Sequence, residues 1–173
     1  MFYALAFVTL GAAGVARAAD DYKSLGLVYF TNVQAGLLQD GIVPYFAFGS
    51  SPQFGAHIQT GSIRNLTGLN LSTLTFQGAV GPHPFLPGNP EIHVINTAQG
   101  DIYCTWTADF TLSFINAEGD AVFSGDGDFL VTGGTGKYEH ATGRFRTLFE
   151  TGPVPFGADE ALAVYSQNGR IKK

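Results

Sequence analysis

A glycine-rich stretch in the last third of the chain resembles a phosphate-binding loop. Its sequence is FLVTGGTGKYEHATGRF, from Phe129 to Phe145, with four glycines around a lysine and small polar residues. A Walker loop needs glycine in place of Val131 and serine or threonine in place of Tyr138, and a dinucleotide loop needs its third glycine in place of Glu139. The required helix is also missing, because the residues that follow continue as a strand pattern. We interpret these glycines as turn positions, with Tyr138 packing over one end of the fold.

The histidines show no catalytic or metal-ligating arrangement. The sequence contains no HExxH, CxxC, EF-hand or GxSxG pattern, and its four histidines, His57, His83, His93 and His140, have no ligand spacing. We therefore expect no metal and no cofactor. His83 lies in a proline-rich segment and His140 beside a turn, so both are predicted to be solvated.

Cys104 and two aspartates are the remaining candidates for chemistry. The single cysteine excludes an internal disulfide, and its position beside Trp106 on an apolar face predicts a small hydrophobic residue rather than a nucleophile. Asp126 and Asp128 are two residues apart and so share one strand face. One could act as a general acid or base in a pocket, but a solvated outer face is the favoured interpretation, since burying unpaired carboxylates is costly.

The composition favours a folded domain over a disordered chain or a nucleic-acid-binding one. The chain has 15 Phe, 7 Tyr and 1 Trp against 9 Lys plus Arg, and its net charge is -5. Phosphate backbones and anionic membranes are bound by clustered lysine and arginine, so neither is an expected partner. At 173 residues the chain is long enough for one core.

Apolar residues recur at every second position, which is the pattern of half-buried strands. In the segment from Gly100 to Asp120 one face holds Cys104, Trp106, Ala108, Phe110, Leu112 and Phe114. This segment and the one after the turn at NAEGD are predicted to form an antiparallel hairpin. Further strands are expected at Leu25–Asn32, Ile42–Phe48, Ala56–Ile63, Leu69–Gln77, Ile92–Ile95, Arg144–Glu150 and Ala161–Arg170.

Seven to nine strands at this spacing predict an all-β sandwich or closed barrel. The proline-rich segment GPHPFLPGNPE is expected to be a loop, because proline cannot pair in a central strand. We expect residues 20–173 to form a single closed antiparallel β-barrel of about eight strands. Such a barrel is just wide enough for side chains or one small ligand.

The first 19 residues are predicted to be a signal peptide. About fifteen apolar or small residues precede Ala16-Arg17-Ala18, a small-x-small cleavage pattern, although no basic residue comes before them. A first barrel strand, FYALAFVTL, is the alternative. Cleavage would yield a secreted or periplasmic protein that is not inserted in a membrane. Asn65 and Asn70 begin two sequons that would accept glycans in a eukaryotic secretory pathway.

Two segments resemble the allene oxide cyclase family. Leu25–Asn32, LGLVYFTN, is similar to that family's GDLVPFTN, and Phe129–Arg146 is similar to its LAITGGSGIFEGAYGQVK and to the Gly-Gly-Thr-Gly stretch of the related dirigent proteins. The resemblance implies an eight-stranded antiparallel barrel, often trimeric, whose apolar cavity cyclises an unsaturated fatty-acid epoxide without a cofactor. Of the family's pocket residues, only an asparagine carries over, to Asn32.

We therefore expect a cofactor-free isomerase or cyclase that acts on a hydrophobic small molecule. Asn32 is the expected catalytic residue, and Tyr29, Tyr103, Trp106 and Phe110 are the expected ligand-binding residues. The alternatives are a non-catalytic binding barrel, a dirigent-like barrel that steers radical coupling, and a barrel filled by its own side chains and used for assembly. A homo-oligomer, dimer or trimer, is compatible with each. A cavity below roughly 300 Å³ would favour the filled barrel.

Overall fold

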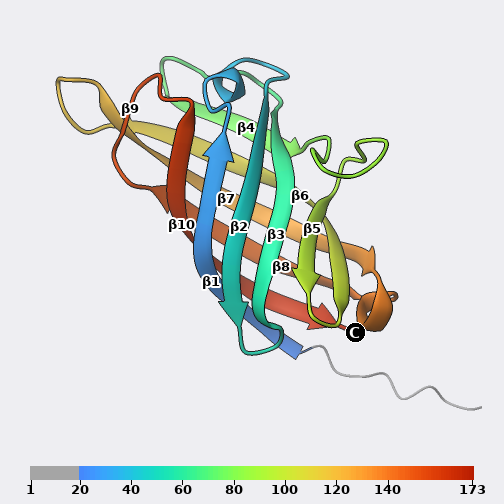
Figure 1. The fold of residues 1–173 in the computed structure, drawn as a ribbon. Helices are drawn as coiled ribbons and strands as arrows, with labels where there is room; N and C mark the ends of the chain where they lie inside the picture. The colour runs from blue at the N-terminus through green and yellow to red at the C-terminus, as the bar shows by residue number, and fades with distance from the viewer. Residues whose placement is uncertain (1–19) are drawn as a thin grey trace, which may run out of the picture.

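The computed structural model describes residues 20–173, which form a single antiparallel sheet of ten strands (Figure 1). The predicted signal peptide, residues 1–19, lies outside the described residues. The strands are β1 (Asp20–Thr31), β2 (Ile42–Ser51), β3 (Gly55–Asn65), β4 (Thr75–Val80), β5 (His93–Thr97), β6 (Gly100–Phe114), β7 (Asp120–Gly134), β8 (Thr142–Thr151), β9 (Val154–Pro155) and β10 (Glu160–Lys172). Within residues 20–173 the only helices are two single 3₁₀ turns, η1 (Ala35–Leu37) and η2 (Gly136–Tyr138), and none could span a membrane.

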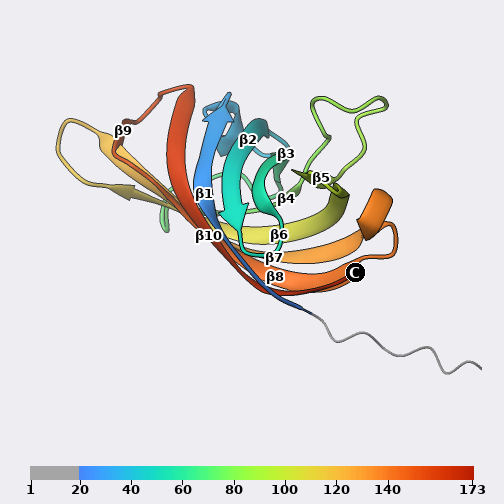
Figure 2. The same ribbon diagram turned by 60° about the horizontal axis from the view of Figure 1, so that its bottom comes forward.

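The strand pairings close into a ring. β1 pairs with β2 and β10, β2 with β3, and β10 with β8, which pairs with β7 and, through it, with β6. β4 and β5 complete the circuit, since each pairs with β3 on one side and with β6 on the other. Figure 1 shows β10, β1, β2 and β3 in front of β6, β7 and β8, and Figure 2 shows the strands curving around a common interior.

The alternation predicted for the long hairpin is present and directs its aromatic side chains into this interior. On β6, Cys104, Trp106, Phe110 and Leu112 are buried, whereas Phe114 at the end of the strand is 46% exposed. Phe129 on β7 and Phe145 on β8 face the same space. The hydrophobic core therefore lies inside the ring, and the side chains that fill it come from every side of the sheet.

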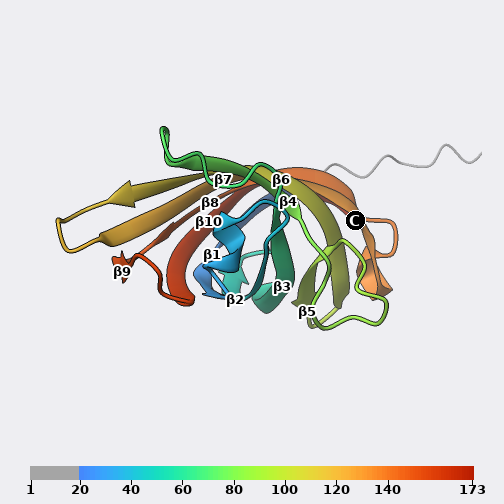
Figure 3. The same ribbon diagram turned by 90° about the horizontal axis from the view of Figure 1, so that it is seen from above.

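Short connections cover the two ends of the ring. The segment after β1, which includes η1, lies over one end (Figure 3), where Gly36 is buried against Val43. At the other end the glycine-rich stretch forms η2, and Tyr138 is fully buried against Phe54, with ring centroids 5.5 Å apart. The turn interpretation of that stretch is confirmed, since Gly136 has φ +56° and no α-helix follows it.

One strand prediction was partly wrong. Leu69–Gln77 was expected to be a strand, but its first half is a turn in which the Asn70 side chain accepts hydrogen bonds from the backbone N–H groups of Ser72 and Thr73. A side chain that bonds to its own backbone in this way competes with strand pairing, and β4 begins only at Thr75. The proline-rich loop prediction is confirmed, because residues 81–92 connect β4 and β5 outside the ladders.

Candidate functional site

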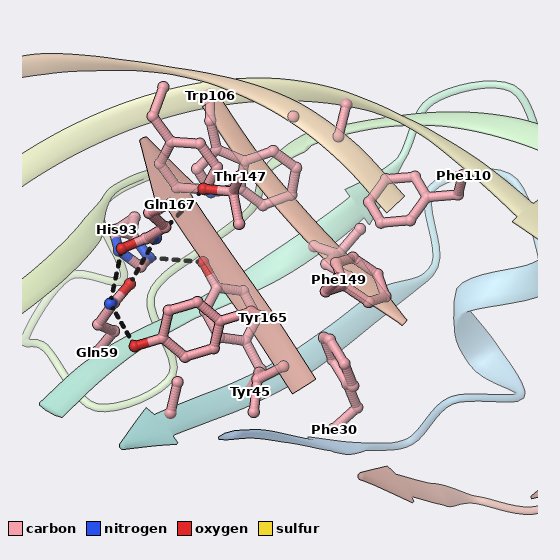
Figure 4. Close-up of a pocket in the computed structure, with 16 residues that line it drawn as sticks. Phe30, Tyr45, Gln59, His93, Trp106, Phe110, Thr147, Phe149, Tyr165 and Gln167 are labelled. Carbon is pink, nitrogen blue, oxygen red and sulfur yellow. Dashed lines mark hydrogen bonds between the residues drawn. The ribbon is translucent and has the colours of Figure 1, made fainter. Parts of the chain in front are cut away.

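An apolar cavity of about 60 Å³ lies inside the ring. Residues of eight strands line it, so the site exists only once the ring is closed. Figure 4 shows its two ends. Phe30, Phe110 and Phe149 form an apolar end, while Tyr45, Gln59, His93, Thr147, Tyr165 and Gln167 bring polar atoms to the other end.

Stacked aromatic rings form the wall between these ends. Phe129 stacks on Trp106 with ring centroids 5.6 Å apart and on Phe145 at 4.9 Å, and its ring lies edge-on to His93 at 5.2 Å. Such contacts fix ring orientations more firmly than aliphatic packing does. The indole and imidazole rings are therefore held in defined positions beside the cavity.

His93 and Tyr45 form a buried pair at the polar end. The Tyr45 hydroxyl lies 2.7 Å from His93 Nδ1, and both residues are almost completely buried. The other ring nitrogen, His93 Nε2, is also buried and has no hydrogen-bond partner among residues 20–173. A buried polar atom without a partner costs free energy. A ligand atom that formed a hydrogen bond with this nitrogen would remove that cost, so we call the nitrogen an open hydrogen-bonding position.

Burial keeps His93 neutral. Removal of the ring from water, with smaller effects of His83 and His57, lowers the pKa of His93 to about 3. A charged imidazolium would be poorly solvated in this apolar interior. At neutral pH His93 therefore offers an uncharged imidazole.

Trp106 supplies a second open position. Its indole Nε1 is buried and has no hydrogen-bond partner in the described part of the chain. It lies near the Tyr45 oxygen, where its polarity offsets part of the rise that burial causes in the pKa of that phenol, but the approach does not have hydrogen-bond geometry. Two buried nitrogens on the cavity wall thus remain available to a guest molecule.

The other polar residues satisfy one another. Gln59 and Gln167 exchange two amide hydrogen bonds of 3.0 Å across the interior, and the Gln59 amide also donates to the Tyr165 hydroxyl at 2.8 Å. Tyr22 donates to Gln167 at 2.5 Å, and Gln167 donates to Thr147 at 3.2 Å. We call this network the polar floor of the cavity, and its hydrogen bonds use most of the donors and acceptors of its side chains. His93 and Trp106, in contrast, each have one nitrogen without a partner among the described residues.

A second pair of groups extends this network away from the cavity. Ser24 Oγ lies 3.1 Å from His57 Nε2, and His57 Nδ1 lies 3.0 Å from the Gly55 carbonyl oxygen, so Nδ1 carries the proton. Glycine is required at position 49, because a Cβ there would lie 2.0 Å from the Tyr165 hydroxyl. Ser24 and His57 do not line the cavity, so they support the floor from behind.

A smaller cavity of about 40 Å³ lies next to the first, under η1. Phe30, Ile63, Phe110 and Phe149 line both cavities, so these four side chains separate them. The Phe149 ring contacts Phe30 and Phe110 at centroid distances of 5.1 and 5.8 Å. Movement of this partition would join the two spaces into one longer apolar channel.

Three of the predicted site residues lie outside the cavity. Asn32 is exposed in the turn after β1, where its φ is +58° and its amide donates to the Ile42 carbonyl at 3.0 Å. Tyr29 is on the outer face of β1, where the Glu160 carboxylate raises the pKa of its phenol. Tyr103 alternates with the buried Cys104 and so points away from the interior. Asn32 has a structural role here, since it holds the turn that leads into β2.

Trp106 and Phe110 do line the cavity, as does a set of residues that the sequence did not reveal. His93 and Tyr45 are 48 positions apart and meet only because β3 lies between their strands. No short-range sequence pattern predicts a contact between residues so far apart in the chain. The polar residues Gln59 and Gln167, which strand alternation would place inside, were the one available signal.

Of the other predictions about reactive residues, some are confirmed and one is wrong. Cys104 is a free, fully buried thiol whose pKa burial raises, as expected for a small hydrophobic residue. Asp126 is on the outer face in an ion pair with Arg146, as expected. His140 is exposed, but His83 is only 2% exposed, so its predicted solvation was wrong. Its ring is bonded to Thr60 and to the backbone of Phe85.

The two sequons also differ. Asn65 is completely buried and its amide donates to the Gly36 carbonyl at 2.6 Å, so the folded chain has no room for a glycan there. Asn70 is exposed in its turn. Within residues 20–173, no group of three or more His, Cys, Asp or Glu side chains could hold a metal ion.

No protein-family model matches the chain, and no curated protein matches it either.

Proposed function

We propose that this protein binds an apolar small molecule that carries one oxygen atom, with the oxygen placed at His93 and Trp106. The observation that carries the proposal is the pair of buried nitrogens, His93 Nε2 and Trp106 Nε1, which have no partner among residues 20–173 and belong to residues that line one apolar cavity. A ligand oxygen there would remove the cost of leaving both nitrogens unpaired.

The proton arrangement supports an oxygen as the group bound. The Trp106 N–H lies near the Tyr45 hydroxyl oxygen and does not accept its proton. We therefore assign the Tyr45 hydroxyl as the donor, and His93 Nδ1 as the acceptor, of the hydrogen bond between them. The neutral imidazole then carries its proton on Nε2. Both open nitrogens become donors, and a carbonyl, ether or epoxide oxygen accepts from such donors.

The remaining lining supports an apolar body for the ligand. Phenylalanine, valine, alanine and isoleucine make up most of the rest of the wall, and no carboxylate or lysine is among the lining residues. Drug-sized ligands occupy pockets of roughly 300 to 1,000 Å³, and this cavity of about 60 Å³ is well below that range. Volume alone therefore favours a barrel filled by its own side chains, and the two unpaired nitrogens are the observation that favours a ligand. The ligand is therefore either a compact molecule or one that displaces the Phe149 partition and extends into the second cavity.

The proposed architecture is a closed β-barrel of the allene oxide cyclase-like or dirigent-like type. If β4 and β5 are counted as one position and β9, which pairs only with β7, is left out, the ring has eight positions. A barrel of about eight strands has an interior that fits side chains or one small ligand. Export through the predicted signal peptide of residues 1–19 belongs to the same proposal.

A cofactor-free isomerase or cyclase is the second candidate, because the same two donors could do chemistry. Neutral N–H groups that converge on one oxygen would stabilise negative charge that develops there as an epoxide opens or an enolate forms. A rigid apolar wall would hold the substrate in one reactive conformer. A neutral imidazole would act here as a hydrogen-bond donor and not as a base.

Native mass spectrometry of the protein purified from its own host tests the proposal. We expect a co-purified apolar molecule that contains oxygen and that organic extraction releases. Asn32→Gly is the matched control, because it retains the positive φ outside the cavity and should keep the ligand, whereas Trp106→Phe should lose most of it.

A panel of epoxides and enones separates the two candidates. Recovery of an isomer with unchanged mass would indicate catalysis, and saturable binding with unchanged compounds would indicate a carrier or sensor. If no extracted ligand is found and no panel member binds or is converted, both candidates fail. The barrel would then be one filled by its own side chains.

A further inference from the structure

One half of the outer surface of the ring is apolar. The outer faces of β3, β2, β1 and β10 carry large hydrophobic side chains that the described part of the chain leaves uncovered. We call this surface the outer apolar face and define it by six residues that are between 43% and 69% exposed: Leu25, Leu27, Phe48, Ile58, Leu162 and Val164.

The residues of the outer apolar face are direct neighbours in the sheet. Leu27 is opposite Phe48 on one side and Val164 on the other, and Phe48 is opposite Ile58. These four side chains form an unbroken row across four strands. The strands lie side by side at the front of the molecule in Figure 1.

The opposite half of the outer surface is mostly polar, although Leu130 on β7 and Leu148 on β8 are 42% and 46% exposed there. There β6 presents Thr105, Thr107 and Asp109 outward, and Asp126 on β7 forms an ion pair with Arg146 on β8. The sequence differs accordingly, since β6 alternates apolar and polar residues, whereas β1 contains the continuous run LGLVYF. Continuous apolar runs are typical of strands that are covered on both faces.

The outer apolar face is somewhat smaller than one side of a standard protein interface. At their exposed fractions, the six residues present on the order of 600 Å², compared with roughly 800 Å² per partner in a standard interface. The largest apolar patch on an ordinary monomer is roughly 300 to 600 Å². None of the six residues is charged, and charged residues on the same strand faces, such as Lys23 on β1 and Glu160 on β10, lie at the margin of the patch.

We propose that the outer apolar face packs against the same face of a second copy of this chain, in a two-fold symmetric dimer. Both edges of β1, β2 and β10 are paired inside the ring, so these strands cannot associate by adding a strand at an edge. Packing of one sheet face on another remains, and a self-complementary patch is what a two-fold interface requires. This interface is independent of the proposed ligand site, which is on the inner face of the sheet.

Sedimentation velocity of the full chain at increasing concentration tests the dimer. The expected result is a species of twice the 18.4 kDa of one chain. Leu27→Lys, at the centre of the row, should weaken self-association at least tenfold. Thr107→Lys is the matched control, because it places the same charge on the polar half of the outer surface and should leave association unchanged.

Two further measurements keep the outcome decisive. Urea unfolding establishes whether Leu27→Lys still folds, and Val164→Thr offers a milder polar change of similar shape if it does not. A wild-type chain that stays at 18.4 kDa at its highest soluble concentration would overturn the proposal. So would equal weakening by Leu27→Lys and Thr107→Lys. Binding of a monomeric chain to neutral phosphatidylcholine vesicles would identify a lipid surface as the occupant and would equally contradict the dimer.

Discussion

His93 is the residue whose protonation should be coupled most strongly to folding. Its pKa is about 3 in the folded chain against an ordinary value of 6.5. Between these values the unfolded chain binds a proton at His93 and the folded chain does not. His93 therefore does not lower the free energy of unfolding above pH 6.5. As the pH falls from 6.5 towards 3, the free energy of unfolding decreases by about 1.4 kcal/mol per pH unit.

His93→Gln removes this pH dependence and still leaves a group that can accept from Tyr45. Urea unfolding of both proteins between pH 7.5 and 4.5 is the measurement. We expect the wild type to be the more stable at pH 7.5 and the difference in free energy of unfolding to shrink by about 3 kcal/mol on acidification, as the linkage of one such group predicts. A difference that stays constant with pH would show that His93 is not held neutral by the fold.

The two sequon asparagines provide a matched comparison of structural roles. Asn65 donates to Gly36 in a buried bond and accepts from the backbone N–H groups of Thr67 and Gly68 in two part-buried bonds. Asn65→Ala should lower the free energy of unfolding by about 3 kcal/mol, because buried partners lose their bonds. Asn70→Ala, in an exposed turn, should cost less than about 1 kcal/mol. Equal losses in urea unfolding would contradict the assigned roles.

Cavity residues were predicted correctly from the sequence where the alternation of inward and outward positions along a strand determines which way a side chain points. Trp106 and Phe110 share the buried face of β6, and both line the cavity. The same alternation places Tyr103 on the outside, so its selection as a ligand residue followed the side-chain type and overlooked the strand face. His93 had no local signal at all, because its environment comes from strands distant in sequence.

At the level of elements, the Phe149 side chain on β8 is part of the partition between the two cavities. Phe149 on β8 fits against the backbone of β7 only because residue 125 is glycine, where a Cβ would lie 2.2 Å from the Phe149 ring. The alternating strand pattern predicted β8, but only the ring closure shows that Phe149 separates two spaces.

Phe149→Ala should join the two cavities into one. We expect tighter binding of the neutral fluorescent probe N-phenyl-1-naphthylamine, by about tenfold, together with a loss of about 3 kcal/mol in the free energy of unfolding from the lost ring contacts. Phe114→Ala, at the exposed end of β6, is the control and should change neither quantity much. Unchanged probe affinity in Phe149→Ala would show that the two cavities do not act as one channel.

For the whole molecule, the all-β class and most strands could be predicted because the period-two pattern is a local property. Closure of the sheet was also predicted, from the number and spacing of the strands. The way in which the ring closes could not be, because it depends on β4 and β5 sharing the space between β3 and β6. The outer apolar face was present in the sequence as the run LGLVYF, but its extent appears only when β1, β2, β3 and β10 are placed side by side.

The central claim is that an oxygen-bearing apolar ligand bonds to Trp106 inside the ring. The chain contains a single tryptophan, so its indole N–H gives one signal in a ¹H–¹⁵N correlation spectrum. Titration with a graded series of aliphatic epoxides, each compared with the alkene of the same carbon skeleton, tests the claim most directly. We predict a saturable downfield shift of the indole proton with at least one epoxide, no such shift with its alkene, and binding at least tenfold weaker in His93→Gln. An indole signal that no epoxide moves, or that epoxide and alkene move alike, would contradict the account.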